Sequence, residues 1–102
     1  MGNSLNIESV WKYPLDITDE QSIVLPYGAR FLSVMEQNNL PTIYACVNPL
    51  AGIKEVWHIS MRGTGHDIGR EMLETSEFLG TIGTHGGELM WHLWLIKEAT
   101  NV

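Results

Sequence analysis

The chain has 102 residues and a formal net charge of −6, with 44% hydrophobic and 18% charged residues. This composition excludes a disordered chain, and the length suits one domain with its own hydrophobic core. No apolar run approaches the roughly eighteen residues of a membrane-spanning helix, and the basic residues are scattered along the chain. The scatter argues against a nucleic-acid binder, which would gather lysine and arginine against phosphates.

Turn-forming residues recur at short intervals and leave segments of strand length between them, which is typical of an antiparallel β domain. We expect strands near residues 9–13, 22–25, 31–37, 42–47, 55–62, 78–84 and 88–96. The segment 69–76 is the one helix candidate, of one or two turns. The predicted fold class is therefore mainly β: a small sandwich or rolled sheet of about seven strands with at most one short helix. We expect a single domain over residues 1–102, with a flexible extension at 1–8 and a flexible tail at 97–102.

The last predicted strand is apolar on both faces. Residues 89–96 read LMWHLWLI, whereas a strand with one face in water alternates apolar and polar residues. The strand is therefore either central and covered on both faces, or part of a subunit interface with Trp91 and Trp94 as anchors. We expect a homo-oligomer, most simply a two-fold dimer. A sandwich whose second sheet buries that face is the alternative.

Two glycine-containing segments form the candidate ligand site: RGTGHD at 62–67 and GTIGTHGG at 80–87. Their backbone N–H groups can approach an anion closely, and an arginine beside them can clamp phosphate. The alternative is that the glycines only supply positive φ at hairpin turns, since neither segment has the context of a dinucleotide fingerprint or a P-loop. The predicted ligand-binding residues are Arg62, Gly63, Thr64, Gly65, His66, Thr84, His85 and Gly86, with Trp11 or Tyr13 stacking on a base.

No catalytic or metal-binding pattern stands out. His58, His66, His85 and His92 lack the spacing of a zinc hydrolase, and no Gly-x-Ser-x-Gly motif occurs. The single cysteine, Cys46, lies in the apolar run 43–47, which favours a buried, unreactive thiol. We expect a protein that is not an enzyme and that binds no metal or cofactor.

The expected location is the cytoplasm. Residues 1–10 carry no basic cluster followed by an apolar run, so we expect no signal peptide. A lone cysteine fits a reducing compartment.

Several motifs, taken in order, resemble a family of short phage and prophage proteins of unknown function. They are WKYPL at 11–15, DEQ at 19–21, LPYGA at 25–29, GTGH at 63–66, FLGT at 78–81 and WHL at 91–93. The resemblance covers most of the chain but carries no catalytic residues. This sequence also has an extended link between GTGH and Phe78, which accommodates the predicted helical turns.

The resemblance implies a context rather than an activity, because small phage proteins are often accessory factors that blunt host defence. We therefore expect a non-enzymatic anti-defence protein in the host cytosol that sequesters a small anionic ligand, such as a nucleotide immune signal. The charge of −6 counts against an anionic ligand. One alternative is a protein–protein inhibitor of a host defence complex, of the CRISPR type or another nuclease. Another is a virion or structural accessory protein. Direct contact with nucleic acid or membrane is not expected.

Overall fold

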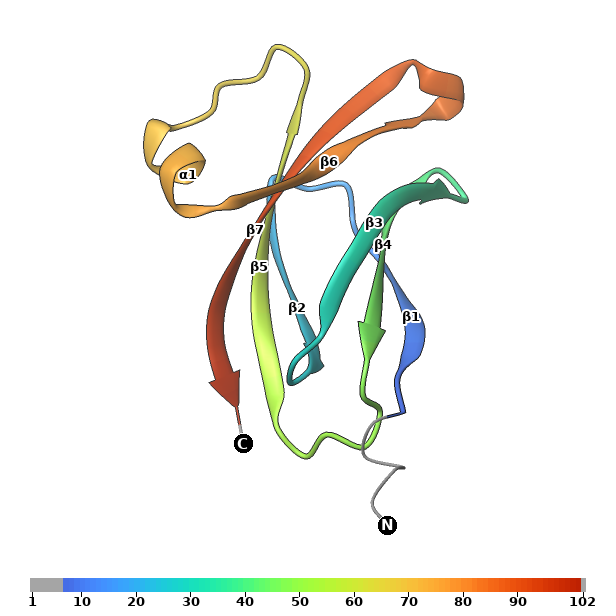
Figure 1. Ribbon diagram of the computed structural model, residues 1–102. Coiled ribbons are helices and arrows are strands. Elements are labelled where there is room, and N and C mark those ends of the chain that lie inside the picture. The colour runs from blue at the N-terminus through green and yellow to red at the C-terminus, as the bar shows by residue number, and fades with distance from the viewer. Residues whose placement is uncertain (1–6, 102) are drawn as a thin grey trace.

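The computed structural model describes residues 7–101, which form seven strands and one short α-helix (Figure 1). The strands are β1 (Ser9–Pro14), β2 (Glu20–Pro26), β3 (Arg30–Gln37), β4 (Leu40–Val47), β5 (Lys54–Gly63), β6 (Glu77–Thr84) and β7 (Leu89–Asn101). The helix α1 spans Arg70–Thr75, and a 3-10 turn, η2, spans His85–Gly87. The predicted mainly β fold is confirmed. Among the residues described, no helix is long and apolar enough to cross a membrane.

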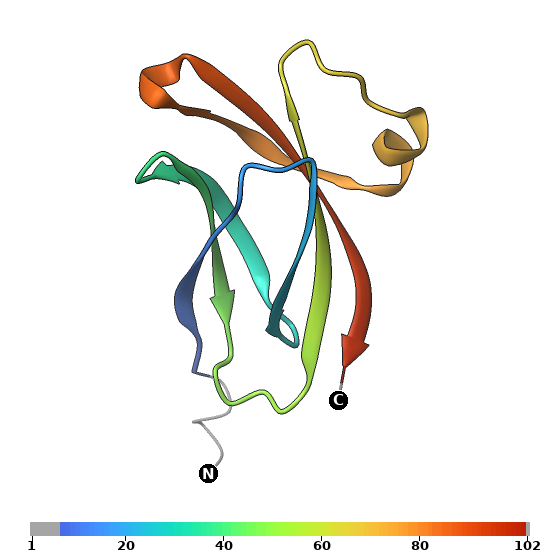
Figure 2. The ribbon, with the colours of Figure 1, turned by 180° about the vertical axis from the view of Figure 1, so that it is seen from behind.

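The strands form two antiparallel sheets that face each other (Figure 2). One sheet has three strands in the order β1-β4-β3, and the other has four in the order β2-β5-β7-β6. The two sheets approach each other closely where β3 runs beside β6. A Cβ at Gly80 of β6 would lie 3.2 Å from Cγ1 of Val34 on β3, so this approach leaves little room for a larger residue.

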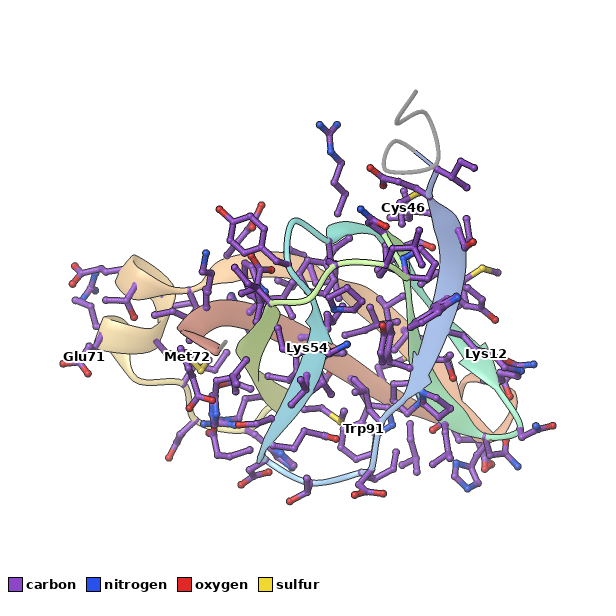
Figure 3. The ribbon with its side chains drawn as sticks, turned by 90° about the horizontal axis from the view of Figure 1, so that it is seen from below. Lys12, Cys46, Lys54, Glu71, Met72 and Trp91 are labelled. Carbon is purple, nitrogen blue, oxygen red and sulfur yellow. The ribbon has the colours of Figure 1, made fainter. Side chains whose placement is uncertain are left out.

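The core lies between the sheets, where side chains from both layers fill the space (Figure 3). On β5 the alternation is clear: Ile59 and Met61 are buried in the core, whereas His58 and Arg62 project from the opposite face. Burying such apolar side chains contributes about 1.5–3 kcal/mol each. The fully buried members of the core are Leu15, Leu25, Ile43, Ala45, Val47, Ile59, Met61, Leu93 and Leu95.

The apolar strand β7 is central, between β5 and β6. Its outer face is only partly covered, because Met90 and Ile96 are 39% and 36% exposed. Leu93 and Leu95 face the core. Trp94 is on the outer face but only 8% exposed. The centroid of its ring lies 5.2 Å from the centroid of the Phe78 ring. Trp91 packs against the core. Both candidate interface tryptophans are therefore packed within the chain, and the homo-oligomer stays a prediction.

The expected tail at 97–102 is wrong for residues 97–101, which continue β7 and pair with β5 as far as Lys54↔Asn101. The register of this pairing shifts between Val56 and Trp57, where Val56 lies opposite Ala99 and Trp57 opposite Lys97. Of the expected extension at 1–8, residues 1–6 lie outside the described part of the chain. Ile7 and Glu8 precede β1 and are exposed.

Two of the hairpin connections contain consecutive residues with positive φ. Asn38 and Asn39 connect β3 to β4 with φ of 55° and 64°, a backbone that asparagine tolerates and that suits a tight hairpin. The β6–β7 connection contains three consecutive residues with positive φ, at His85, Gly86 and Gly87. The two hairpin tips are joined by a hydrogen bond of 3.2 Å from the His85 N–H to Oδ1 of Asn39.

Candidate functional site

A pocket of about 190 Å³ opens where β5 ends and β7 begins. The turn at residues 63–66 forms one side and the first residues of β7 the other. This volume is below the roughly 300–1,000 Å³ of sites for drug-sized ligands, so the pocket suits a single ring system. Its lining residues are Gly63, Thr64, His66, Glu88, Leu89, Met90 and Trp91.

The 63–66 turn holds the His66 ring against the backbone of Gly63. The His66 N–H donates to the Gly63 carbonyl at 3.0 Å, and the Gly63 N–H donates to Nδ1 of His66 at 3.2 Å. A Cβ on residue 63 would lie 3.0 Å from the ring, so glycine permits this contact. Because Nδ1 accepts a hydrogen bond, the neutral imidazole carries its proton on Nε2 and offers a donor there.

Thr64 connects the pocket to the outer face of the four-stranded sheet. Its Oγ1 is 2.8 Å from Nε2 of His92, and Nδ1 of His92 is 2.8 Å from Oγ1 of Thr81. The Thr64 N–H also donates to the Met90 carbonyl at 3.3 Å. Both ring nitrogens of His92 therefore have partners, and the position of Thr64 is fixed through its side chain and its backbone.

Trp91 is fixed by a hydrogen bond inside the domain. Its Nε1–H donates to Oγ1 of Thr84 at 3.0 Å, and Thr84 is 1% exposed. Nδ1 of His85 is also 3.0 Å from that hydroxyl. Thr84 and His85 thus support Trp91 and do not line the pocket. The indole N–H is already used, so Trp91 offers a ligand its apolar ring.

Arg62 lies outside the pocket, on the outer face of the sheet. Its guanidinium donates to the Asp19 carbonyl at 2.8 Å, to the Met61 carbonyl at 3.0 Å and to the Glu20 carboxylate at 2.5 Å. These bonds occupy the group that was expected to clamp a phosphate.

The aromatic residues expected to stack on a base are on the other sheet. Trp11 of β1 is 42% exposed, and Tyr13 packs against the core. The Tyr13 hydroxyl is buried without a partner among residues 7–101, and burial raises the pKa of this phenol. Neither ring lines the pocket.

The predicted site is therefore brought together only in part: Gly63, Thr64 and His66 line one pocket, Gly65 belongs to the same turn without lining it, and the other predicted residues lie elsewhere. For Gly65 and Gly86, with φ of 91° and 68°, the positive φ that turns require is present.

A family model described as a domain of unknown function, DUF7352, matches residues 7–101. The chain belongs to the DUF7352 family. The expectation of an uncharacterised family is confirmed, while a phage origin stays a prediction. No curated protein and no solved structure matches the chain.

The sequence interpretation missed Glu88, which lines the pocket of this DUF7352 domain. Its backbone N–H donates to the His85 carbonyl at 3.3 Å as part of the β6–β7 turn. Its carboxylate makes no hydrogen bond or ion pair with any residue that the structure describes. Its position directly after the HGG sequence could have suggested a part in binding. The 63–66 turn comes near Glu88, however, only because β5 pairs with β7.

The DUF7352 domain also carries a polar network around Glu20 that the sequence interpretation missed. Oε1 of Glu20 lies 2.5 Å from Nε2 of His58 and accepts a hydrogen bond of 2.8 Å from Ser60, and Oε2 accepts from Arg62. Burial alone raises the pKa of this carboxyl, but the hydrogen bonds from His58, Arg62 and Ser60 and the charge of Arg62 lower it to about 2. Side chains alternate between the two faces along β5, so these three donors lie on one face. This alternation was the signal from which the network could have been predicted.

Within the described part of the chain, no three side chains of the metal-ligating types are grouped so that they could hold an ion. The residues that line the pocket bring an imidazole at His66, a hydroxyl at Thr64, an acidic side chain at Glu88 and the apolar side chains of β7.

Proposed function

We propose that this DUF7352 domain is a non-enzymatic binding protein that sequesters a small nucleotide-like molecule. The observation that supports this most is the pocket itself, in which part of a glycine segment singled out by sequence faces an apolar wall at the start of β7. Ligand sites typically combine an apolar lining with a few fixed polar groups. Thr64 and His66 are such groups, since both are held by hydrogen bonds.

The charges of the site favour the ring of a nucleotide in the pocket and its phosphates outside. Glu88 is an exposed acidic residue of the lining, Arg62 is committed to Glu20, and the whole chain has a charge of −6. An anionic group inside would meet repulsion rather than a clamp. The anionic character of the ligand would then contribute little to its affinity.

The role in the cell that we propose is sequestration of a nucleotide signal that a host uses in defence. The support for this context is the resemblance of the chain to short phage and prophage proteins. Sequestration requires tight binding without turnover, and the hydrogen-bonded Thr64 and His66 give the pocket fixed polar groups for binding.

The test is thermal unfolding of the full chain with a panel of nucleosides, mononucleotides and cyclic oligonucleotides. A ligand at about 1,000 times its dissociation constant stabilises the folded state by about 4 kcal/mol, which raises Tm by more than about ten degrees in a domain of this size. His66→Ala should abolish the shift, and Lys12→Ala, on the other sheet, should leave it unchanged. No shift with any member of the panel would contradict the proposal.

A second candidate function is inhibition of a partner protein. Leu89 and Met90 are 44% and 39% exposed beside the pocket, and exposed apolar side chains next to a carboxylate can anchor a basic partner. This candidate predicts a stoichiometric complex with one host protein that dissociates as salt is raised and is lost in Met90→Asp. It gains support only if the nucleotide panel gives no shift.

A further inference from the structure

Taking the proposed function as its basis, we infer that the pocket selects a guanine-type ring and that Glu88 reads its two adjacent N–H groups. The starting point is Glu88, an exposed residue of the pocket lining whose side chain has no partner among the described residues. An ionised carboxylate only accepts hydrogen bonds, and its two oxygens match two parallel N–H donors in one plane.

The edge of guanine that pairs with cytosine has this arrangement. Its ring N–H and its exocyclic amino group point in the same direction, with the carbonyl oxygen next to them. The corresponding edges of adenine and cytosine place an acceptor nitrogen beside a single amino group. That nitrogen would face a carboxylate oxygen, and two acceptors repel each other.

The remaining groups of the pocket fit the same ring. The Nε2–H of His66 is a donor, because Nδ1 is occupied by the Gly63 N–H, and it can serve the guanine carbonyl. Leu89, Met90 and Trp91 supply apolar contact for the ring. The Trp91 N–H is bonded to Thr84, so it does not compete for the ligand's polar edge.

A guanidinium group also presents two parallel donors, and an arginine side chain is the other source of this chemistry. It has no acceptor, so it would make no hydrogen bond with the His66 donor, which guanine can engage through its carbonyl. The pairing of a donor at His66 with an acceptor at Glu88 therefore favours guanine.

The experiment measures the affinities of guanosine, inosine, adenosine, GMP and L-argininamide for the full chain by calorimetry. Inosine lacks the exocyclic amino group, and the loss of one hydrogen bond to a charged acceptor should weaken binding by about tenfold or more relative to guanosine. Adenosine should bind more weakly still. GMP should bind within about threefold of guanosine, because its phosphate lies outside the pocket.

The matched variants are Glu88→Gln and Glu71→Gln. The amide at position 88 removes one acceptor and should lower guanosine affinity by about tenfold or more, with little change for inosine. Glu71 is an exposed residue of α1 outside the pocket, so its variant should bind guanosine as the unaltered protein does.

The outcomes separate the two proposals. Equal affinities for guanosine, inosine and adenosine, or an unchanged affinity in Glu88→Gln, would overturn the guanine inference while nucleotide binding stands. Binding of L-argininamide as tightly as guanosine would also overturn it. No binding of any nucleoside or nucleotide would refute the proposed function itself.

Discussion

Replacing Glu20 by glutamine tests the polar network on the outer face of the four-stranded sheet. The carboxylate receives hydrogen bonds from His58, Ser60 and Arg62, and these lower its pKa from 4.5 to about 2. A lowering of this size in a fully buried group would correspond to about 3 kcal/mol of folding free energy. The Glu20 side chain is 45% exposed, so water screens the interaction and we expect about 1 kcal/mol.

The assay is thermal unfolding at a series of pH values. At pH 7, Glu20→Gln should lower Tm by about 4–8 °C, the effect of about 1 kcal/mol in a domain of this size. The folded-state pKa lies below the ordinary value of 4.5. The stabilisation is therefore complete above about pH 4.5 and is lost as the pH falls toward 2. The difference in Tm between the two proteins should shrink over that interval.

Glu74→Gln is the control, because Glu74 is an exposed residue of α1 and surface substitutions of this kind change stability by less than about 0.5 kcal/mol. A Tm difference for Glu20→Gln that is as large at pH 3 as at pH 7 would refute the reasoning. So would the absence of any difference at pH 7, since the three donors would then gain nothing from the ionised carboxylate.

Three further substitutions probe the pocket and the core. Gly63→Ala places a Cβ 3.0 Å from the His66 ring and should displace it, weakening nucleoside binding by about tenfold and shifting the imidazole signals of His66 in NMR spectra. Thr84→Val should cost about 1–3 kcal/mol in urea unfolding, because the half-buried Trp91 N–H loses its acceptor. Thr84→Ser keeps a hydroxyl and should cost less; equal losses would contradict this. Leu93→Ala, at a position with no exposed surface, should lower the free energy of unfolding by about 2–5 kcal/mol. A loss below about 1 kcal/mol would show that the core around Leu93 is not packed as described.

The sequence was sufficient for the strands and for the turns between them, because these depend on local chemistry. The short connection between the predicted strands 31–37 and 42–47 marked the β3–β4 hairpin, and the helix formers at 69–76 marked α1, which spans Arg70–Thr75. The apolar run of β7 correctly implied a strand that could be central. The end of that strand was misjudged at residue 97, because polar residues near the end of a chain are typical of a tail, and only the partner strand β5 shows that they continue the sheet.

The site could be predicted only in part, because it depends on which strands become neighbours. The turn at 63–66 was identified from its glycines, and three of its residues line the pocket. The direction of Arg62 depends on Glu20, which reaches it only through the pairing of β2 with β5. Glu88 belongs to the site because β7 runs beside the end of β5, with Gly63 opposite Trp91. A linear sequence gives no order of strands within a sheet, so these contacts could not be derived from it.

The position of β7 has a consequence for how the domain folds. This strand is the last of the seven in the described chain, yet it lies in the interior of its sheet, between β5 and β6. Without it, β6 has no partner in the sheet, and β5 keeps one unpaired edge. During synthesis, β5 would therefore keep an unpaired edge, and the core would stay partly exposed to solvent, until residues 89–101 have left the ribosome. Such non-local pairing also slows folding. We thus expect refolding in milliseconds to seconds, and strong sensitivity of the yield to changes in β7 that leave the finished structure stable.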